Sequence, residues 1–509
     1  MNTADYNIRP TLFERLVLQP LGLQRDNALV IWLLLLISGI TIWGFWYFDG
    51  DVPVVLVLLY WVGKFVLSFL RVDFSFYVLA FNALVFDQFP IPKFSSLTYQ
   101  ISYFKNLQEV WNIPELRVIN SFDLHLLILI LAIFFILSFK KGFGWKSIPV
   151  FFPFLLFFFS FLGSMLYSLE NETFWNALWG GRAIFYFFVL YLLVPQIVRT
   201  KNQVRVLFWF LIVGISVKAF QAIVRFIEMG FTTGGLETLT NREDPVIMVT
   251  LLIFLIGLII FNVRNKQRLW LCILLVPLLM GFYFGMQLMA YASFFSSLVI
   301  FFMILPAFVK WKFTKYILPF FLLFGIYGAI FWRSDSILAR PVQIIKYEIS
   351  KLPDYTSYFD RNTTTEIIES LNFNPILGIG FNKKDDNGVQ PAPFNYELNP
   401  IPNQFIWILV RTGFMGFLAF WYFFNVFASK GIKVFLKISD PYLKVIVLVI
   451  ITAIINQMVA SCFDFQVNYY RNMIYLGCLM GLLPAVEDYV GSVKTSNPPR
   501  SENVPKLSG

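Results

Sequence analysis

The sequence predicts an all-α protein, a polytopic bundle of about 12–14 transmembrane helices with a large, partly helical loop on its outer side. Of its 509 residues, 58% are hydrophobic and only 14% are charged, and the mean hydropathy is +0.69. The apolar residues form long runs and do not recur with the 3.6-residue period of an amphipathic helix. Runs of about 17–25 apolar residues are what a helix needs to cross a bilayer. We therefore expect an integral, multi-pass membrane protein.

The apolar runs, taken in chain order, predict about fourteen spans. The first run is long enough to cross the membrane and lacks a small-residue cleavage site, so we expect no removable signal peptide. The turns that divide 52–89 and 268–308 are very short, and these two divisions are the least defined. The predicted spans are 28–48, 52–70, 72–89, 124–139, 148–168, 180–196, 206–228, 245–262, 268–282, 285–308, 316–332, 403–428, 445–463 and 471–486.

Basic residues cluster in alternate connections between these spans. If the N-terminal segment 1–27 is cytoplasmic, the clusters fall on the cytoplasmic side, as the positive-inside rule requires. The short connections "LENETFWN" and "FDFQVN" on the other side contain no basic residue. We therefore expect both termini to be cytoplasmic. The clusters are Lys140, Lys141 and Lys146; Arg199, Lys201 and Arg205; Arg264, Lys266 and Arg268; Lys310, Lys312 and Lys315; and Lys430, Lys433, Lys437 and Lys444.

Two long segments, 90–122 and 333–402, fall on the outer side in this topology. In the second, "RPVQIIKYEISKL" reads as an amphipathic helix, and Thr363 with Glu366 in "NTTTEIIESL" is a capping box that would open another helix. "FNPILGIGF" then combines a proline stop with a Gly-x-Gly turn. The predicted organisation is a cytoplasmic segment 1–27, spans 1–11 within 28–332, the outer loop 333–402, spans 12–14 within 403–486, and a disordered cytoplasmic tail 487–509.

The composition argues against several classes of function. The net charge of +10 does not predict nucleic-acid binding, because the basic residues lie in short clusters between apolar runs. The three cysteines, Cys272, Cys462 and Cys478, lie in apolar segments, and His125 is the single histidine. This set lacks the spacing of a zinc site. We expect no metal, no disulfide and no cofactor.

Cations at the outer ends of predicted spans are candidate functional residues, because an isolated cation at a helix centre in lipid costs roughly 2.5–3.5 kcal/mol. Arg182 follows two glycines at the outer end of its span, and Arg471 opens the last span. Arg411 lies inside the span 403–428, roughly 12 Å below Asn403 by the helical rise.

One face of the span 206–228 is also polar in its outward half. Lys218, Gln221, Arg225 and Glu228 follow one another at intervals of three, four and three residues, so they share that face.

Each of these charges also has a structural interpretation. Arg471 fits an interfacial anchor, Arg225 fits an ion pair with Glu228, and Lys64 fits a side chain that snorkels toward the cytoplasmic interface. Arg182 and Arg411 have no acid within one turn of sequence, which favours a functional role. Convergent arginines suit a phosphate or pyrophosphate, which they bind bidentately.

The stretch 361–420 carries a recognisable combination of features. Arg361 in the outer loop is followed by "NPILGIGF" and then by "NQFIWILVRTGFMG", in which an Asn precedes a Gly by ten residues at the entry to a span. With the number of spans and the loop placement, this resembles the O-antigen ligase and O-antigen polymerase superfamily. The resemblance implies a metal-independent glycosyltransferase of the bacterial inner membrane that acts on undecaprenyl-pyrophosphate-linked glycans at the periplasmic face. The large outer loop would then be periplasmic.

The resemblance also implies roles for individual residues. Arg361 matches the loop arginine before "NPILGIG", and Arg182 matches an arginine on an earlier span. With Arg411, these arginines would stabilise charge on the departing pyrophosphate. The candidate catalytic residues are Arg361, Arg411, Arg182 and Glu397, and the candidate substrate-binding residues are Arg225, Arg471, Lys218, Asn403, Gln404, Gly378 and Gly380.

The incoming sugar hydroxyl also benefits from a base, typically by roughly 10²–10⁴-fold. Ligases of this family typically carry a histidine before the Asn, where this chain has Pro402, and often an acid two residues before the Gly, where it has Arg411. The Ser-Arg pair common on a mid-chain span is absent from "MAYASFFSS". The remaining candidate bases are Glu397, Glu366, Glu228 and His125.

The missing histidine favours a polymerase of O-antigen or exopolysaccharide repeat units over a ligase that transfers glycan to a lipid or another acceptor. A lipid-linked glycan flippase or an inactive scaffold is the alternative from another class. A flippase needs access to both faces, whereas the cations here favour the outer half. The expected partners are the lipid-linked oligosaccharide, the acceptor glycan or lipid, a flippase and a chain-length regulator.

Overall fold

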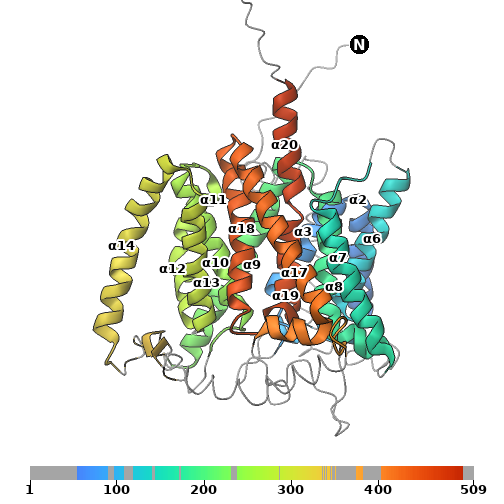
Figure 1. The fold of residues 1–509 in the computed structure, drawn as a ribbon, viewed down its shortest axis with the longest axis horizontal. Coiled ribbons are helices and arrows are strands. Elements are labelled where there is room, and N and C mark those ends of the chain that lie inside the picture. Colours follow the sequence, from blue (N-terminus) through green and yellow to red (C-terminus); the bar gives the residue numbers. More distant parts are fainter. Residues whose placement is uncertain are drawn as a thin grey trace, which may run out of the picture.

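The computed structural model describes most of the helical bundle (Figure 1). The predictions for the segment 1–27, the span 28–48, most of the two outer loops and the end of the tail lie outside the described residues. The structure describes 54–89, 97–107 without 102, 119–139, 144–170, 174–230, 238–334 without 286, scattered positions between 336 and 350, 374–381 and 403–496.

The all-α prediction is confirmed for this part of the chain. Its elements are helices, and within the described ranges the only β pairing is an isolated bridge between Asn106 and Asn120. The helices are α2 (Val54–Leu70), α3 (Val72–Val85), α4 (Leu97–Gln100), α6 (Ser121–Phe139), α7 (Phe151–Tyr167), η4 (Ser168–Glu170), α8 (Phe174–Ile197), α9 (Lys201–Glu228), α10 (Glu243–Ile260), α11 (Lys266–Ile273), α12 (Leu275–Phe284), α13 (Leu288–Ile304), α14 (Ala307–Phe331), α17 (Gln404–Lys437), α18 (Pro441–Ala460), η7 (Gln466–Asn468), α19 (Tyr470–Met480) and α20 (Leu483–Ser496).

Several of these helices can cross a membrane. By length and composition, seven helices among the described residues qualify, or eight if the bent pair α11 and α12 forms one span. Shorter apolar helices, α3, α7 and α13, occupy the positions of further predicted spans. The chain is therefore a multi-pass membrane protein, with fewer full-length spans in its described part than the fourteen expected.

The span predicted over 268–282 consists of two helices in the structure. α11 and α12 are bent by 52° at Leu274, which separates them. Pro277 explains the bend, because it has no N–H to donate to the carbonyl of Ile273 and its ring clashes with that carbonyl in a continuous helix. The region is a broken helix.

Three of the connections predicted to share the cytoplasmic side meet at one end of the bundle, which we call the basic end. Lys146 lies 2.5 Å from Asp488 and Lys430 lies 3.0 Å from Glu487, and both acids belong to α20, the helix at the top of Figure 1. Lys201 pairs there with Asp440 of the α17–α18 connection. The alternation of loops read from charge is thus consistent with the fold.

The centre and the edge of the bundle differ in burial. α10 and α18 are buried along most of their length, in the middle of the bundle, whereas α14 is exposed along nearly all of its length and stands at one edge in Figure 1. In a membrane protein, the exposed apolar surface of α14 is expected to contact lipid.

α17 is broken near its start, so the predicted span 403–428 is not one continuous helix. Gly413 adopts φ 64° and ψ −171°, a left-handed conformation that glycine adopts readily. In Figure 1 the first turns of α17, in light orange, run across the lower end of the bundle, and the remainder turns upward. Arg411 therefore lies in the last turn of the first segment and not deep within a straight span.

The segment 374–380 replaces the helical hydrogen bonds that this break removes. The N–H groups of Phe414 and Met415 donate to the carbonyls of Pro375 and Ile376, at 2.9 and 3.3 Å. The carbonyls of Val410 and Arg411 accept from the N–H groups of Ile379 and Gly380, at 3.0 and 3.1 Å. A broken helix is tolerated at membrane depth only where other protein groups satisfy its backbone.

We expect Gly413→Ala to destabilise the protein, because this backbone conformation, adopted almost only by glycine, costs of order 1–3 kcal/mol for a residue with a Cβ. The added Cβ would also contact the carbonyl of Ile376. Thermal unfolding in detergent measures the effect. Gly325→Ala on α14 is the matched control, since nothing lies within 4 Å of a Cβ there. Equal unfolding temperatures for the two variants would contradict this account of the break.

Candidate functional site

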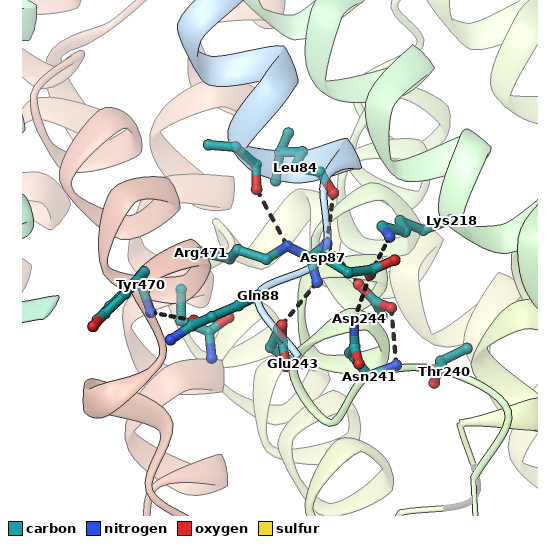
Figure 2. A network of polar contacts seen from close by, with 12 residues as sticks. Leu84, Asp87, Gln88, Lys218, Thr240, Asn241, Glu243, Asp244, Tyr470 and Arg471 are labelled. Carbon is teal, nitrogen blue, oxygen red and sulfur yellow. Dashed lines mark hydrogen bonds and ion pairs between the residues drawn. The ribbon is translucent and has the colours of Figure 1, made fainter. Parts of the chain in front are cut away.

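Buried charges gather between α9 and the ends of neighbouring helices (Figure 2). They lie at the end of the bundle opposite the basic end, because α9 starts at the basic end with Lys201 and carries its buried cations in its second half. Three cations take part: Lys218 and Arg225 from α9, and Arg471 from the start of α19. The Asp87 network, as we call it, consists of these cations with Asp87, Asn241, Glu243 and Asp244. We call this end of the bundle the Asp87 end.

Asp87 follows the end of α3 and binds α9 to the start of α10. Its Oδ1 accepts hydrogen bonds from Lys218 Nζ and, at 2.5 Å, from Asn241 Nδ2. Its Oδ2 accepts from Thr98 Oγ1 at 2.5 Å and lies 3.7 Å from Arg225 Nη2. Burial alone would raise the pKa of Asp87, but the nearby Lys218 and Arg471 outweigh it and hold that pKa below its ordinary value.

Arg471 is only 1% exposed and is enclosed by acceptors. Its Nη1 donates to Glu243 Oε1 at 2.8 Å, and its Nη2 lies 2.7 Å from Asp244 Oδ1. The backbone carbonyls of Ala83 and Leu84, at the end of α3, accept from Nε and Nη2 at 3.2 and 2.5 Å. Arg471 thus joins α3, α10 and α19.

Local sequence explains why the two acids are found here. Glu243 and Asp244 occupy the first turn of α10, where a helix N-terminus favours negative charge. Asp244 also accepts from the backbone N–H of Asn241 at 3.1 Å, which fixes the approach to the helix. The sequence "NREDP" is therefore a helix start that also supplies counter-charges.

The network is balanced, because three carboxylates (Asp87, Glu243, Asp244) face three cations (Lys218, Arg225, Arg471). Such pairs are costly to bury and very costly to break. The structure gives Arg225 a carboxylate in Asp87, and it buries Arg471 within the protein. That Lys218, Arg225 and Arg471 bind substrate stays a prediction.

Arg182 of α8 has a carboxylate partner from another helix. Its Nη2 donates to Asp123 at the start of α6, and its Nη1 donates to Asn106 Oδ1 at 3.3 Å. The guanidinium lies 5.6 Å from the ring centres of both Tyr186 and Tyr470. Since Tyr470 precedes Arg471, the Arg182 cluster adjoins the Asp87 network.

Arg411 is half-buried at the break in α17. Its Nη1 donates to the carbonyl of Gly380 at 3.3 Å, and Ser164 of α7 donates to its backbone carbonyl at 2.5 Å. Gly378 and Gly380, both with positive φ, pack against backbone and side chains so closely that a Cβ would lie 2.5 Å from the nearest atom. The two glycines shape the turn that holds Arg411.

Asn403 and Gln404 anchor the start of α17. Asn403 caps the helix, its Oδ1 accepting from the N–H groups of Phe405 and Ile406. Gln404 is fully buried, and its Oε1 accepts from the backbone N–H of Val467 at 3.2 Å. Both residues therefore have structural roles, and their role toward a substrate stays a prediction.

The interpretation of Lys64 as a snorkelling side chain is wrong. Lys64 is buried in the bundle, its Nζ 3.4 Å from His125 Nδ1 and 4.3 Å from the ring centre of Tyr60. Ser75 binds the other ring nitrogen of His125 at 3.0 Å. The aromatic rings around Lys64 supply a cation–π environment in the interior.

Sequence reasoning missed most of the carboxylates that bind the cations. Asp87, Asp123 and Asp244 each lie within a few residues of an end of a predicted span, and a buried arginine needs such a counter-charge. An acidic residue near the end of a predicted span could therefore have been identified as a partner for a buried cation. Asp464, in the connection between α18 and α19, carries the same signal, because it directly follows the predicted span 445–463.

Some candidates cannot be placed. Arg361, Glu366 and Glu397 lie outside the described residues. Glu228 is exposed at the end of α9, and His125 is buried between α2, α3 and α6. Within the described ranges, no group of three His, Cys, Asp or Glu side chains could hold a metal ion.

The fold and the apolar helices define a multi-pass α-helical membrane protein with buried ion pairs at one end. No family model matches the chain, and no curated protein is significantly similar to it.

Proposed function

We propose that this protein is a membrane glycosyltransferase that polymerises undecaprenyl-pyrophosphate-linked repeat units of an O-antigen or exopolysaccharide. In this proposal it resides in the bacterial inner membrane with both termini in the cytoplasm. The basic end then faces the cytoplasm and the Asp87 end faces the periplasm, which agrees with the positive-inside rule.

The observation that carries the proposal is the direct contact between the two parts of the motif. "NPILGIGF" and "NQFIWILVRTGFMG" are separated by 21 residues (382–402). In the fold, four backbone hydrogen bonds between 375–380 and 410–415 join them into one unit. This unit holds the guanidinium of Arg411 against Gly380. If the two segments form one motif, they should lie together in the fold. Their backbone hydrogen bonds support the proposal.

Cations at the Asp87 end would assist the departure of the pyrophosphate. Fixed positive groups in a low-dielectric setting stabilise charge that develops on a leaving group. Arg182 and Arg411 are held by neighbouring groups, so they need little reorganisation. Arg361 would join them from the large loop. The acceptor glycan supplies the attacking hydroxyl.

A ligase that transfers the glycan to a lipid or another acceptor is the alternative within the family. Pro402, where ligases typically have histidine, favours the polymerase. A flippase or an inactive scaffold would bind the same anionic carrier without forming a glycosidic bond. In the cell, a flippase and a chain-length regulator would work beside a polymerase.

Deleting the gene separates the polymerase from the ligase. In cells that make a lipid-linked repeat unit, we expect the deletion to leave single units on the carrier and no long chains, because the units are no longer joined. Extracted carrier-linked glycans, sized after mild acid release, report the result. Long carrier-linked chains that accumulate in the deletion would reject the polymerase in favour of the ligase.

A further inference from the structure

The connection between α18 and α19 lies against the start of α17, where the motif begins. The backbone N–H of Gln404 donates to the carbonyl of Ser461 at 3.0 Å, and Gln404 Oε1 accepts from Val467. On the other side, Asn472 Nδ2 donates to Gln466 Oε1 at 2.6 Å. The connection therefore spans from the motif helix to the residue next to Arg471.

Asp464 lies in this connection and is 5% exposed. Its carboxylate accepts from Gln466 Nε2 at 2.9 Å and from the Tyr469 hydroxyl at 3.1 Å. The nearest cation is Arg242, whose Nη1 lies 3.8 Å from Oδ1 and whose side chain is 41% exposed. Unlike the acids of the Asp87 network, Asp464 thus has a loosely placed and partly solvated cation beside it.

Two neighbouring amides have unused hydrogen-bonding capacity. Gln404 and Asn472 are both fully buried, yet Gln404 Nε2 and Asn472 Oδ1 lack a hydrogen-bond partner among the residues that the structure describes. Buried polar atoms are usually paired. Both amides bind the connection that carries Asp464, Gln404 through Val467 and Asn472 through Gln466, so their unpaired atoms are available to a ligand that enters beside Asp464. Sugar hydroxyl groups both donate and accept, which matches this set.

We propose that Asp464 is the proton acceptor for the acceptor-sugar hydroxyl, and that Gln404 and Asn472 bind adjacent hydroxyl groups of that sugar. This inference rests on the proposed glycosyl transfer and supplies the base that the motif lacks. The hydroxyl proton passes to the Asp464 carboxylate as the oxygen forms a bond to the anomeric carbon. The bond from that carbon to the pyrophosphate oxygen breaks, and its electron pair leaves with undecaprenyl pyrophosphate. Asp464 then releases the proton to water.

The surroundings of Asp464 suit a base. Burial raises its pKa above the ordinary value, and Arg242, with the hydrogen bonds from Tyr469 and Gln466, acts in the opposite direction. A carboxylate with a raised pKa accepts a proton more readily near neutral pH. Among the residues that the structure describes, Arg242 and Tyr469 are the charged and titratable side chains in contact with its carboxylate.

The test is chain growth by the purified protein in proteoliposomes with a lipid-linked repeat unit, measured from pH 4 to pH 9. We expect Asp464→Asn to lower the rate roughly 10²–10⁴-fold while the protein unfolds at a similar temperature. Asp440→Asn, which removes a carboxylate at the basic end, is the matched control and should retain the wild-type rate.

The pH profile distinguishes a base from a structural residue. The wild-type rate should be full above the Asp464 pKa and fall as pH drops through it, at a higher pH than the usual value of about 3.9 for aspartate. Arg242→Gln should move this fall to higher pH, because it removes a cation that lowers the pKa. In Asp464→Asn the fall should disappear from the residual activity.

The outcomes separate the two proposals. An active wild type whose rate and acid fall are unchanged in Asp464→Asn would overturn this inference and leave the proposed function in place. A wild-type protein that extends no chain would overturn the proposed function, and this inference with it.

Discussion

Replacing Arg471 with methionine is expected to lower the free energy of unfolding by about 3–5 kcal/mol, because it leaves Glu243 and Asp244 buried without their cation. Two backbone carbonyls at the end of α3 also lose their donor. We therefore expect little folded protein in the membrane at growth temperature. Fluorescence-detected size-exclusion chromatography and thermal unfolding in detergent measure this.

A triple variant tests the reason for the loss. Adding Glu243→Gln and Asp244→Asn to Arg471→Met removes the uncompensated charges and should recover part of the stability. Lys430→Met, which breaks an exposed ion pair with Glu487, should cost no more than about 1 kcal/mol. If Arg471→Met were as stable as Lys430→Met, the Asp87 network would not hold the bundle together.

The second large effect concerns activity. Arg411→Ala should lower the rate of glycan chain growth by roughly 10²–10³-fold, as removal of one fixed donor to a developing charge typically does. Its side chain is only half-buried, so we expect a smaller loss of stability than for the fully buried Arg471. Arg411→Lys should restore little activity, because lysine lacks the planar, two-pronged donor geometry.

The length of glycan made in deletion cells that carry each variant measures this effect, with protein levels determined in the same membranes. Lys437→Ala, at the other end of α17, is the control and should restore full-length chains. Full activity of Arg411→Ala would show that this arginine serves only the structure.

Sequence predicted the class of fold and the alternation of loops because both follow from local rules. Apolar runs determine which segments can enter lipid, and lysine clusters determine the shared side. The ion pairs at the basic end, such as Lys146 with Asp488, agree with that alternation. Span lengths were less predictable, since composition alone does not reveal breaks such as the one at Gly413.

The break in α17 depended on a partner segment distant in sequence. Nothing within "VRTGFM" requires Gly413 to leave the helix; it can do so because 375–380 supplies the missing hydrogen bonds. For the same reason, the sequence did not predict the break two residues after Arg411.

The sequence predicted the cations of the candidate site but did not predict the carboxylates that pair with them. Arg182, Lys218, Arg225 and Arg471 stood out because charge is rare in apolar runs. Their carboxylate partners come from other helices, as Asp123 does for Arg182, so sequence spacing could not pair them. The sequence did not single out Asp464 as a base. Gln404 is distant from it along the chain, and Asn472 belongs to no motif that would mark it.

The measurement that tests the central claim most directly is chain growth by the purified wild-type protein in proteoliposomes supplied with one lipid-linked repeat unit. The account predicts a ladder of carrier-linked products longer than one unit, absent from an Arg411→Ala preparation that contains the same amount of folded protein. A folded wild-type protein that leaves the repeat unit unextended, or transfers it only to a separate lipid acceptor, would contradict the assignment as a polymerase.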